Sequence, residues 1–507
     1  MDPPSLRARV TLGLLLLAPV GAVLALPRVP VPPENPITEP KRVLGKILFW
    51  DEQLSSDNTV ACGTCHRPAS GGADPRYGRH PGTDPGTIDD VYGSPGIVGM
   101  DSGGMAVEHP VFGRGHQITG RLSPSNFGGL WAERLFWDGS AGPEFRDPVT
   151  GRVVIERHGA LEAQTLVALS NDAEMMKPGR EWAELTAKLE HEAPLALATG
   201  WPEDVRAAIG ADPSYPALFE RAFGDPAITA VRIAFAIAAY QRTLVADETP
   251  WDRYQAGDDD AMTAAEVQGW RAFQSLRCMN CHVPPLFTND AFFNIGLRRV
   301  EYDPGRMGVT GDPADAGDMK VPSLRNAGLR KRFMHTGEFT HLGAAIGFYQ
   351  TGTVFPERDD IPGAGTYAFN MSSVQERDLF AFIGEALTDP RVRDETYPFD
   401  RPRLRTENAT QDTQPPAVPG KLTATRVDGE VVLSWDEPAD DTGVVDYVLQ
   451  RNRRIAALTT ATRFTDRDAG PERLSYRVYA RDAALNESGA AEVIIGEAAG
   501  PEGESGR

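Results

Sequence analysis

Apolar residues recur at helical spacing through most of the chain between residues 34 and 400. Residues 226–245 are apolar on nearly every side of the helix they would form, which predicts a largely buried helix. Thr263 to Glu266 has the pattern of a capping box, and apolar residues follow it at helical spacing. Residues 373–387 predict a further helix that ends before Pro390. Strand patterns are scarce, so we expect this part to be mainly α-helical.

The pattern changes near the C-terminus. Residues 401–415 are polar and helix-poor, which predicts a linker. Residues 416–497 then alternate with period two in runs separated by turn residues, which predicts a small all-β, immunoglobulin-like sandwich. The clearest strand patterns are Val431–Trp435, Tyr447–Gln450 and Tyr476–Ala480. Residues 498–507 are predicted to be a disordered tail.

The N-terminus has the pattern of an export signal. Arg7 and Arg9 precede an apolar run from Val10 to about Leu26, and Val23 to Ala25 offers a small-residue cleavage site. We therefore predict a signal peptide over residues 1–25, a Pro-rich spacer over residues 26–40, and a periplasmic location. The apolar run is about 17 residues long, at the lower edge for a membrane span, so a retained anchor is the alternative.

Charge narrows the function. The chain has 507 residues, with 51 Lys and Arg against 71 Asp and Glu, giving a net charge of −20. This balance argues against nucleic acid as a partner, because nucleic-acid binders carry basic footprints. It would instead steer basic partners toward the protein.

All four cysteines lie in two C-x-x-C-H motifs, and that sequence is the attachment signature of c-type haem. Two thiols one helical turn apart can add to the two vinyl groups of one porphyrin, and the adjacent His then reaches the iron. A four-Cys zinc site, redox dithiols and plain disulfides are the alternatives, but none of them explains a His after both pairs. We therefore predict two covalently bound haem c groups, attached through Cys62 and Cys65 with His66 as iron ligand, and through Cys278 and Cys281 with His282 as iron ligand.

Several blocks around these motifs resemble the bacterial di-haem cytochrome c peroxidase/MauG family. The resemblance covers roughly residues 35–400 and rests on residues 44–51, 135–139, 322–326 and 333–337 as well as on the two haem motifs. It implies two cytochrome-c-like helical haem domains, over residues 41–225 and 226–400. The haem of His66 would be peroxidatic and that of His282 electron-transferring. The segment after the linker resembles a fibronectin type III domain, through Trp435, Tyr447 and residues 476–482.

The same resemblance suggests residues for the distal side of the first haem. Peroxide reduction needs an acid–base group there, which moves a proton between the two peroxide oxygens. The family has a Glu in an L-E-x-Q block, which points to Glu162, with Glu144 as the competitor. Residues 140–160 would then be an insertion containing a hairpin, and Glu174-Met175 fits a further family block. His80 is the candidate distal iron ligand that leaves on activation, with His116 and His109 as rivals; MauG-like members lack this ligand.

For the second haem, counting from the F-H-x-G block places Tyr349 where the peroxidases have a Met ligand and MauG has Tyr. Met334 and Met319 are alternatives, and Tyr349 could equally be a core aromatic. The resemblance also implies calcium between the haems, held partly by backbone carbonyls. The matching stretch, residues 328–332, is strongly basic, which puts calcium in doubt. Arg325 is a candidate partner for a haem propionate, and Trp131 for the Trp that lies between the haems.

Three functions follow from these features. The first is reduction of hydrogen peroxide with electrons from a small cytochrome c or cupredoxin. The second is a MauG-like oxidase that uses peroxide to oxidise a protein or an organic substrate. The third is a non-enzymatic di-haem electron carrier. A homodimer, and a surface or protein ligand for the fibronectin-like segment, are left open.

Overall fold

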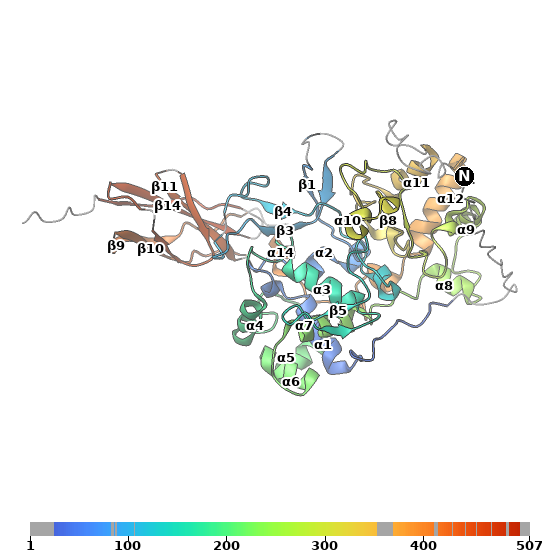
Figure 1. Cartoon of the computed structure of the whole chain (residues 1–507), viewed down its shortest axis with the longest axis horizontal. Helices are drawn as coiled ribbons and strands as arrows, with labels where there is room; N and C mark the ends of the chain where they lie inside the picture. Colours follow the sequence, from blue (N-terminus) through green and yellow to red (C-terminus); the bar gives the residue numbers. More distant parts are fainter. Residues whose placement is uncertain are drawn as a thin grey trace, which may run out of the picture.

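The computed structural model describes residues 25–496, apart from residues 83–85, 87–88, 106, 352–368, 410–413, 428, 442, 453, 468 and 483–485. A helical part and an elongated β part form the molecule, with the β part projecting from one end (Figure 1). Within the described residues, no helix is long and apolar enough to cross a membrane. The predicted signal peptide, apart from residue 25, and the predicted tail lie outside these residues.

The first helical body surrounds helix α1 (Glu39–Phe49), which packs along α7 (Ala230–Gln241). Gly45 makes this close approach possible, because a Cβ at this position would lie 1.9 Å from the carbonyl oxygen of Ala236. The other helices of this body are α2 (Cys62–Cys65), α3 (Ala160–Ser170), α4 (Trp182–His191), α5 (Glu203–Ala211) and α6 (Tyr215–Phe223). Their buried faces share one hydrophobic core with α1 and α7.

The second helical body is built on α9 (Ala264–Ser275) and α12 (Ser373–Ala381). Thr263 and Glu266 form the predicted capping box at the start of α9, which is thus confirmed. Where α9 crosses α12, a Cβ on Gly269 would lie 2.0 Å from the carbonyl oxygen of Asp378. This body also contains α8 (Pro250–Gln255), α10 (Met307–Thr310), α11 (Leu342–Thr351) and a π-helical turn after α12 (Phe382–Ala386).

The first hydrophobic core extends beyond residue 225, where the sequence predicted the division between the two haem domains. Helix α7 was assigned to the second haem domain, but its buried residues belong to the core of the first. Val392, Phe399 and Leu404, which follow α12 in the chain, also pack into that first core. Short α13 (Pro390–Arg393) lies in this returning segment. The predicted division at residue 225 stays a prediction for the haem domains; in the structure, the chain leaves the first body only after α7 and returns to it after residue 390.

The helical part also contains short two-stranded sheets. They pair β1 (Gly78–His80) with β2 (Val91–Gly93), β3 (Pro95–Val98) with β4 (His116–Ile118), β5 (Phe145–Arg146) with β6 (Val153–Ile155), and β7 (Phe292–Phe293) with β8 (Met319–Lys320). The β5–β6 pair is the hairpin predicted within residues 140–160.

The predicted linker contains a short helix, α14 (Arg405–Ala409), where no helix was expected. The backbone N–H groups of Arg405 and Thr406 donate to the Glu52 carboxylate at 2.9 and 3.1 Å. This buried carboxylate satisfies the orphan donors of the first turn, which explains a helix in a sequence with little helical pattern.

Seven strands form two antiparallel sheets at the C-terminal end, in the orders β13-β10-β9 and β12-β11-β14-β15. They are β9 (Gly420–Val427), β10 (Glu430–Asp436), β11 (Val444–Arg451), β12 (Arg454–Thr459), β13 (Arg463–Asp466), β14 (Leu474–Asp482) and β15 (Ala491–Ile495). The three strand patterns singled out in the sequence fall in β10, β11 and β14. Trp435, Tyr447 and Tyr476 lie in the core between the sheets.

The sandwich is attached to the helical part by polar and apolar contacts. The buried Arg481 guanidinium forks onto Asp446 and also donates to the carbonyl oxygen of Arg114 at 3.2 Å. Arg114 in turn pairs with Glu487. Val448, on the outer face of β11, is fully buried in the core of the first helical body.

A buried ion pair fastens α3 to α7. Arg242, at the C-terminal end of α7, donates two hydrogen bonds to Glu162 in α3, at 2.6 and 2.9 Å. The side chain of Glu162 is fully buried and that of Arg242 nearly so. Asn35 of the N-terminal segment donates to the same carboxylate at 2.8 Å.

We expect Glu162→Gln to destabilise the first helical body by about 3–5 kcal/mol, because it leaves the Arg242 charge buried without its counter-ion. Urea unfolding of the full chain, followed by far-ultraviolet circular dichroism, measures the effect. The matched control is Glu144→Gln, since Glu144 is exposed and pairs only with the exposed Arg146 among the described residues. That variant should stay within about 0.5 kcal/mol of the parent chain. Equal unfolding midpoints for the two variants would refute a structural role for the ion pair.

Candidate functional site

The first C-x-x-C-H motif is a single helical turn, α2, with His66 directly after it. The backbone N–H of Ala61 donates to Thr64 Oγ1 at 2.8 Å, which fixes the start of the turn. Gly63 lies on the ring of Trp50, and a Cβ there would come within 2.2 Å of that ring. The turn therefore has its two thiols on a rigid backbone.

The ring of His66 is oriented by its own loop. Its Nδ1 lies 3.0 Å from the carbonyl oxygen of Gly72. A carbonyl can only accept, so Nδ1 carries the proton and Nε2 keeps a free lone pair. Burial lowers the pKa of His66, which favours the neutral ring that a metal needs.

The second motif repeats this arrangement. It follows α9 through a short turn, Cys278–Asn280, and His282 comes directly afterwards. Its Nδ1 lies 3.1 Å from the carbonyl oxygens of both Phe287 and Pro322. Burial also lowers the pKa of this imidazole. Both histidines thus have Nε2 available as an axial ligand.

A cavity of about 710 Å³ opens beside the first motif and is lined by Cys65 and His66. The wall also includes residues 119–126 and 135–138, Leu161, Gln164 and Val167 of α3, and, from the second body, Arg298, Asp303 and residues 320–323. Its size lies within the usual range for cofactor sites, roughly 300–1,000 Å³. The residues present therefore fit a haem attached at Cys62 and Cys65.

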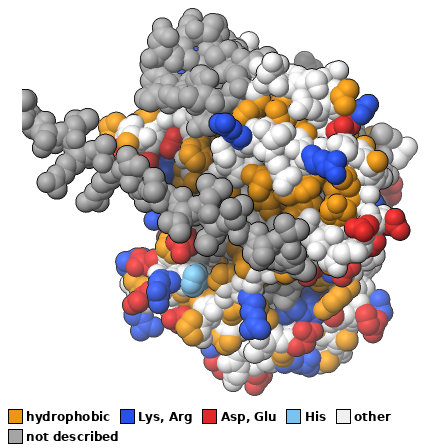
Figure 2. Space-filling view, turned by 90° about the vertical axis from the view of Figure 1, so that its right-hand side faces the viewer, with side chains coloured by type: hydrophobic (Ala, Val, Ile, Leu, Met, Phe, Trp, Pro, Cys, Tyr) orange, Lys and Arg blue, Asp and Glu red, His pale blue; other side chains and the backbone are white. Residues whose placement is uncertain are grey.

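The second motif lies among apolar side chains that the rest of the protein covers only in part. Residues packed on the second core but only half-buried include Trp270, Leu276, Met279, Leu324 and Met334. Figure 2 shows hydrophobic side chains exposed together on the face toward this body, with Lys and Arg at their edge. Large exposed apolar side chains of this body include Val283, Val374 and Phe380. Such a surface fits a second porphyrin, whose apolar faces would cover it.

Four carboxylates line the cavity, and three of them are neutralised by arginine. Asp89 pairs with Arg298, while Asp138 and Asp303 share Arg121. The fourth, Glu174, accepts a hydrogen bond from Asn171 Nδ2 at 2.8 Å and forms no ion pair within the described part of the chain. Burial raises the pKa of Glu174 to about 7, against the lowering effect of Asn171.

The structure places both predicted acid–base residues outside this cavity. Glu162 is held by Arg242 and Asn35 on the far side of α3, and Glu144 is exposed beside Arg146. Neither lines the wall, so the predicted distal role does not fit the geometry. The cavity face of α3 and the turn after it is instead formed by Leu161, Gln164, Val167, Asn171 and Glu174.

The missed residues carry a detectable signal. Leu161, Gln164, Val167, Asn171 and Glu174 are spaced by three or four, which is the spacing of one helix face, although α3 itself ends at Ser170. Glu162 is one position from Leu161 and so points about 100° away from that face. Helical spacing, applied to the family blocks that contain Gln164 and Glu174, would have selected Glu174.

His80 is brought together with His66. It ends strand β1 and lines the same cavity, next to Asp89 and Arg298. Its Nδ1 accepts a hydrogen bond from the backbone N–H of Gly82 at 3.1 Å, so Nε2 is the ring nitrogen that remains for an iron. The rivals lie outside the cavity wall: His116 is within 2.6 Å of the Gly96 carbonyl oxygen, and His109 stacks on Phe112.

Tyr349 lies in α11, half-buried, with ring contacts to Phe348 and Phe369. Of the two alternatives, Met319 is buried in β8 and Met334 packs on the second core. The axial ligand opposite His282 stays a prediction.

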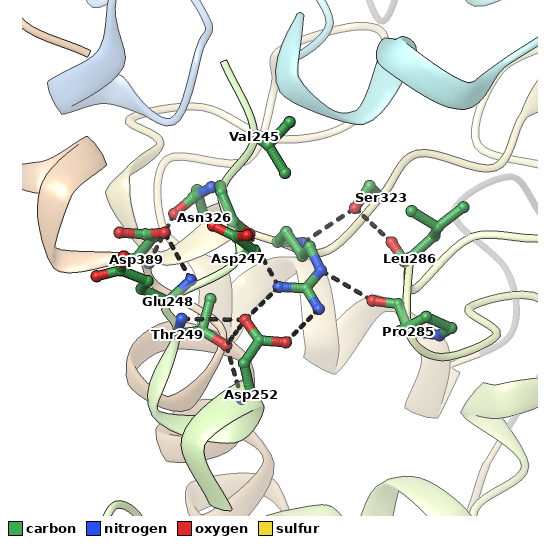
Figure 3. A network of polar contacts seen from close by, with 12 residues as sticks. Val245, Asp247, Glu248, Thr249, Asp252, Pro285, Leu286, Ser323, Asn326 and Asp389 are labelled. Atoms are coloured by element: carbon green, nitrogen blue, oxygen red, sulfur yellow. Dashed lines mark hydrogen bonds and ion pairs between the residues drawn. The ribbon is translucent and has the colours of Figure 1, made fainter. Parts of the chain in front are cut away.

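Arg325 is engaged by protein groups. Its guanidinium forks onto Asp252 at 2.7 and 2.8 Å and donates to the carbonyl oxygens of Pro285 and Ala246 at 2.8 and 3.1 Å. Figure 3 shows Asp252, Thr249, Pro285 and Ser323 converging in this network. Four of its five N–H groups are thereby used, so the fork is not available for a propionate, and Arg325 is a structural clamp. Trp131 lines a narrow gap together with Arg325, and its Nε1 donates to the Pro27 carbonyl oxygen at 2.9 Å.

The stretch that would correspond to a calcium site, residues 328–332, contains three basic residues, Arg330, Lys331 and Arg332. Within the residues that the structure describes, no group of three or more His, Cys, Asp or Glu side chains could hold a metal. The carbonyl oxygen of Arg332 accepts instead from Arg330 Nε at 3.3 Å. The guanidinium of Arg330 therefore already contacts one backbone oxygen of this stretch.

Comparison with known proteins gives a consistent picture. The family model described as di-haem cytochrome c peroxidase matches residues 39–260. Methylamine utilization protein MauG of Paracoccus denitrificans is 30% identical over 404 residues, which cover 70% of this chain and 90% of that protein. Cytochrome-c peroxidase IdrP1 of Denitromonas iodatirespirans is 28% identical over 420 residues, covering 75% and 91%. Cytochrome c551 peroxidase of Pseudomonas aeruginosa is 27% identical over 374 residues, covering 70% and 86%.

A solved structure supports the fold. The crystal structure of a MauG-like protein associated with microbial copper homeostasis superposes with a TM-score of 0.53 at 24% identity, covering 74% of this chain and 96% of that one. Together with the two haem motifs and their shared geometry, these matches show that the chain is an oxidoreductase that belongs to the di-haem cytochrome c peroxidase family, which includes MauG.

Proposed function

We propose that this protein reduces hydrogen peroxide to water with electrons from a small cytochrome c or cupredoxin, using two haem c groups attached through its two C-x-x-C-H motifs. The balanced reaction takes one peroxide, two protons and two electrons, one from each of two donor molecules, and forms two waters. Bound haem supplies the site for peroxide and stores the electrons.

The unpaired carboxyl group of Glu174 is the observation that carries this proposal. It lines the cavity of His66, and it lacks the arginine partner that each of the other cavity carboxylates has among the described residues. A group with a pKa near 7 can both accept and return a proton at neutral pH. We therefore assign to Glu174 the proton transfer for which Glu162 was first considered.

Other residues of the cavity wall support the reaction. Asn171 holds Oε1 of Glu174, which aims the carboxyl group. Gln164, seven residues or about two helical turns before Asn171, offers a further amide toward the cavity. We retain His80 as the distal ligand of the resting state, because it lines the same cavity as His66 and has one ring nitrogen unused by Gly82.

The second motif is proposed as the entry point for electrons. The half-buried motif residues Cys278, Cys281 and His282 would bring an attached haem close to the protein surface, where a small redox protein can reach it. We further propose that the chain is exported to the periplasm, where haem c is attached. The sandwich, with its three- and four-stranded sheets and its buried Trp435, is proposed to be a fibronectin type III-like domain that holds the enzyme near a surface or partner.

Steady-state turnover of the holoprotein with hydrogen peroxide and reduced cytochrome c tests the proposed function. We expect saturable, peroxide-dependent oxidation of the donor. A protein that exchanges electrons with cytochrome c but shows no peroxide turnover would be a carrier, and the proposal would fail.

Replacing Glu174 by Gln should lower kcat/KM for peroxide by between about a hundred- and ten-thousand-fold, because the amide cannot relay a proton. In the parent enzyme the carboxylate must accept a proton first. The rate should therefore fall as the pH drops below about 7, where Glu174 becomes protonated. The Gln variant should lose this acidic limb.

The matched control for this prediction is Glu144→Gln, which removes a carboxylate outside the cavity. It should retain the activity and the pH profile of the parent. A Glu174→Gln enzyme with parental kcat/KM would eliminate Glu174 as the acid–base group.

A MauG-like oxidase is the second candidate, favoured by Tyr349 at the position where MauG has Tyr. If its hydroxyl is a ligand of the second iron, both Tyr349→Phe and Tyr349→Met should change the optical and EPR spectra of that haem. The Met variant should in addition raise its midpoint potential, since a thioether favours the reduced iron. A Phe variant with unchanged spectra identifies Tyr349 as a core aromatic.

A further inference from the structure

Arg330 lies directly behind the loop that holds His66. A Cβ on Gly71 would lie 3.3 Å from Arg330 Cγ and 2.4 Å from the carbonyl oxygen of Asn326, so this basic loop packs tightly on the turn that contains Gly72. Gly72 is the residue whose carbonyl oxygen accepts from His66. The charge of Arg330 is close enough to act on the His66 imidazole.

The guanidinium of Arg330 is surrounded by backbone oxygens. Its Nη2 donates to the carbonyl oxygen of Ser123 at 3.2 Å and its Nε to that of Arg332 at 3.3 Å. Ser123 also contacts the first haem motif, because its Oγ donates to the carbonyl oxygen of Cys65 at 3.3 Å. Arg330 therefore connects the loop of the second haem segment to the first motif.

Within the described part of the chain, no carboxylate pairs with Arg330. The cause of its lowered pKa, about 10, is burial alone. At neutral pH the group nevertheless keeps its charge. Its neighbours do not compensate it: Arg332 stacks on Tyr77 and Tyr92, and Lys331 is exposed. The half-buried guanidinium donates to backbone carbonyl oxygens, which are also among the ligands that proteins give to calcium.

We propose that the Arg330 guanidinium is a built-in cation that takes the place of the calcium ion implied by the family resemblance. It uses one carbonyl oxygen of the stretch 328–332, that of Arg332, together with that of Ser123, and it brings a fixed positive charge to the His66 side. A divalent ion in contact with these two oxygens would meet the guanidinium at close range, where like charges repel. The protein is consequently independent of calcium.

The first test uses the intact holoprotein. Metal analysis should find less than one calcium per ten chains after purification without chelator. Treatment with EGTA, followed by dialysis against calcium chloride, should leave the thermal midpoint and both haem EPR signals unchanged. One calcium per chain, with signals that respond to EGTA, would overturn the proposal.

The second test replaces the cation. Arg330→Ala should lower the midpoint potential of the His66 haem, because a lost positive charge no longer favours the reduced iron, and should lower the thermal midpoint. Arg330→Lys should restore most of the potential, since it keeps the charge. Lys331→Ala is the matched control: it removes the same charge from the adjacent exposed position and should change neither quantity.

The outcomes separate this inference from the enzymatic proposal, because none of these readouts depends on peroxide turnover. If Arg330→Ala and Lys331→Ala give the same potential and stability, Arg330 has no special role. If Arg330→Ala fails to fold, Arg330→Lys and the calcium measurements on the parent protein still decide the question.

Discussion

The candidate chemistry depends on one kind of hydrogen bond, from a histidine Nδ1 to a backbone carbonyl oxygen. At both motifs this bond fixes the tautomer, so that Nε2 is free for iron. The carbonyls come from loops outside the five-residue motifs: Gly72 for His66, and Phe287 and Pro322 for His282. Cysteine spacing alone would attach a porphyrin, but the surrounding loops decide how its axial ligand is oriented.

Those loops are linked to each other. Pro322 accepts from His282, and Arg330, eight residues later, packs behind the loop of His66. Arg325, between them, is clamped by Asp252. One short segment therefore contacts the surroundings of both proximal histidines. This arrangement explains why a P-S-L-R-N block, which contains no iron ligand, belongs to the constellation that identifies the family.

Local patterns predicted local structure well. The capping box at Thr263, the hairpin with Val153 to Ile155 and the strands of the sandwich all depend on neighbours in sequence, and each is observed. Long-range packing was harder. Nothing in the sequence of α7 says that its apolar surface meets α1, because the approach relies on the single missing Cβ of Gly45. The role of Arg325 failed for a related reason: a guanidinium suits any carboxylate, and only the fold places Asp252 next to it.

The position of Glu162 is instructive about buried charge. Two glutamates lie twelve residues apart on α3 and the turn after it: Glu162 is fully buried, and Glu174 is half-buried in the cavity wall. Glu162 has its arginine, so its negative charge is compensated and it serves stability. Glu174 has an amide in place of a cation, so its protonated and ionised forms are close in free energy. Arg330 is the converse case, a cation with carbonyls in place of an acid. Near His66, charged side chains without an ionic partner among the described residues are therefore better guides to function than side chains in ion pairs. A charge that is withdrawn from water without an ionic partner lowers the stability of the fold, so we expect to find it where it has a functional role.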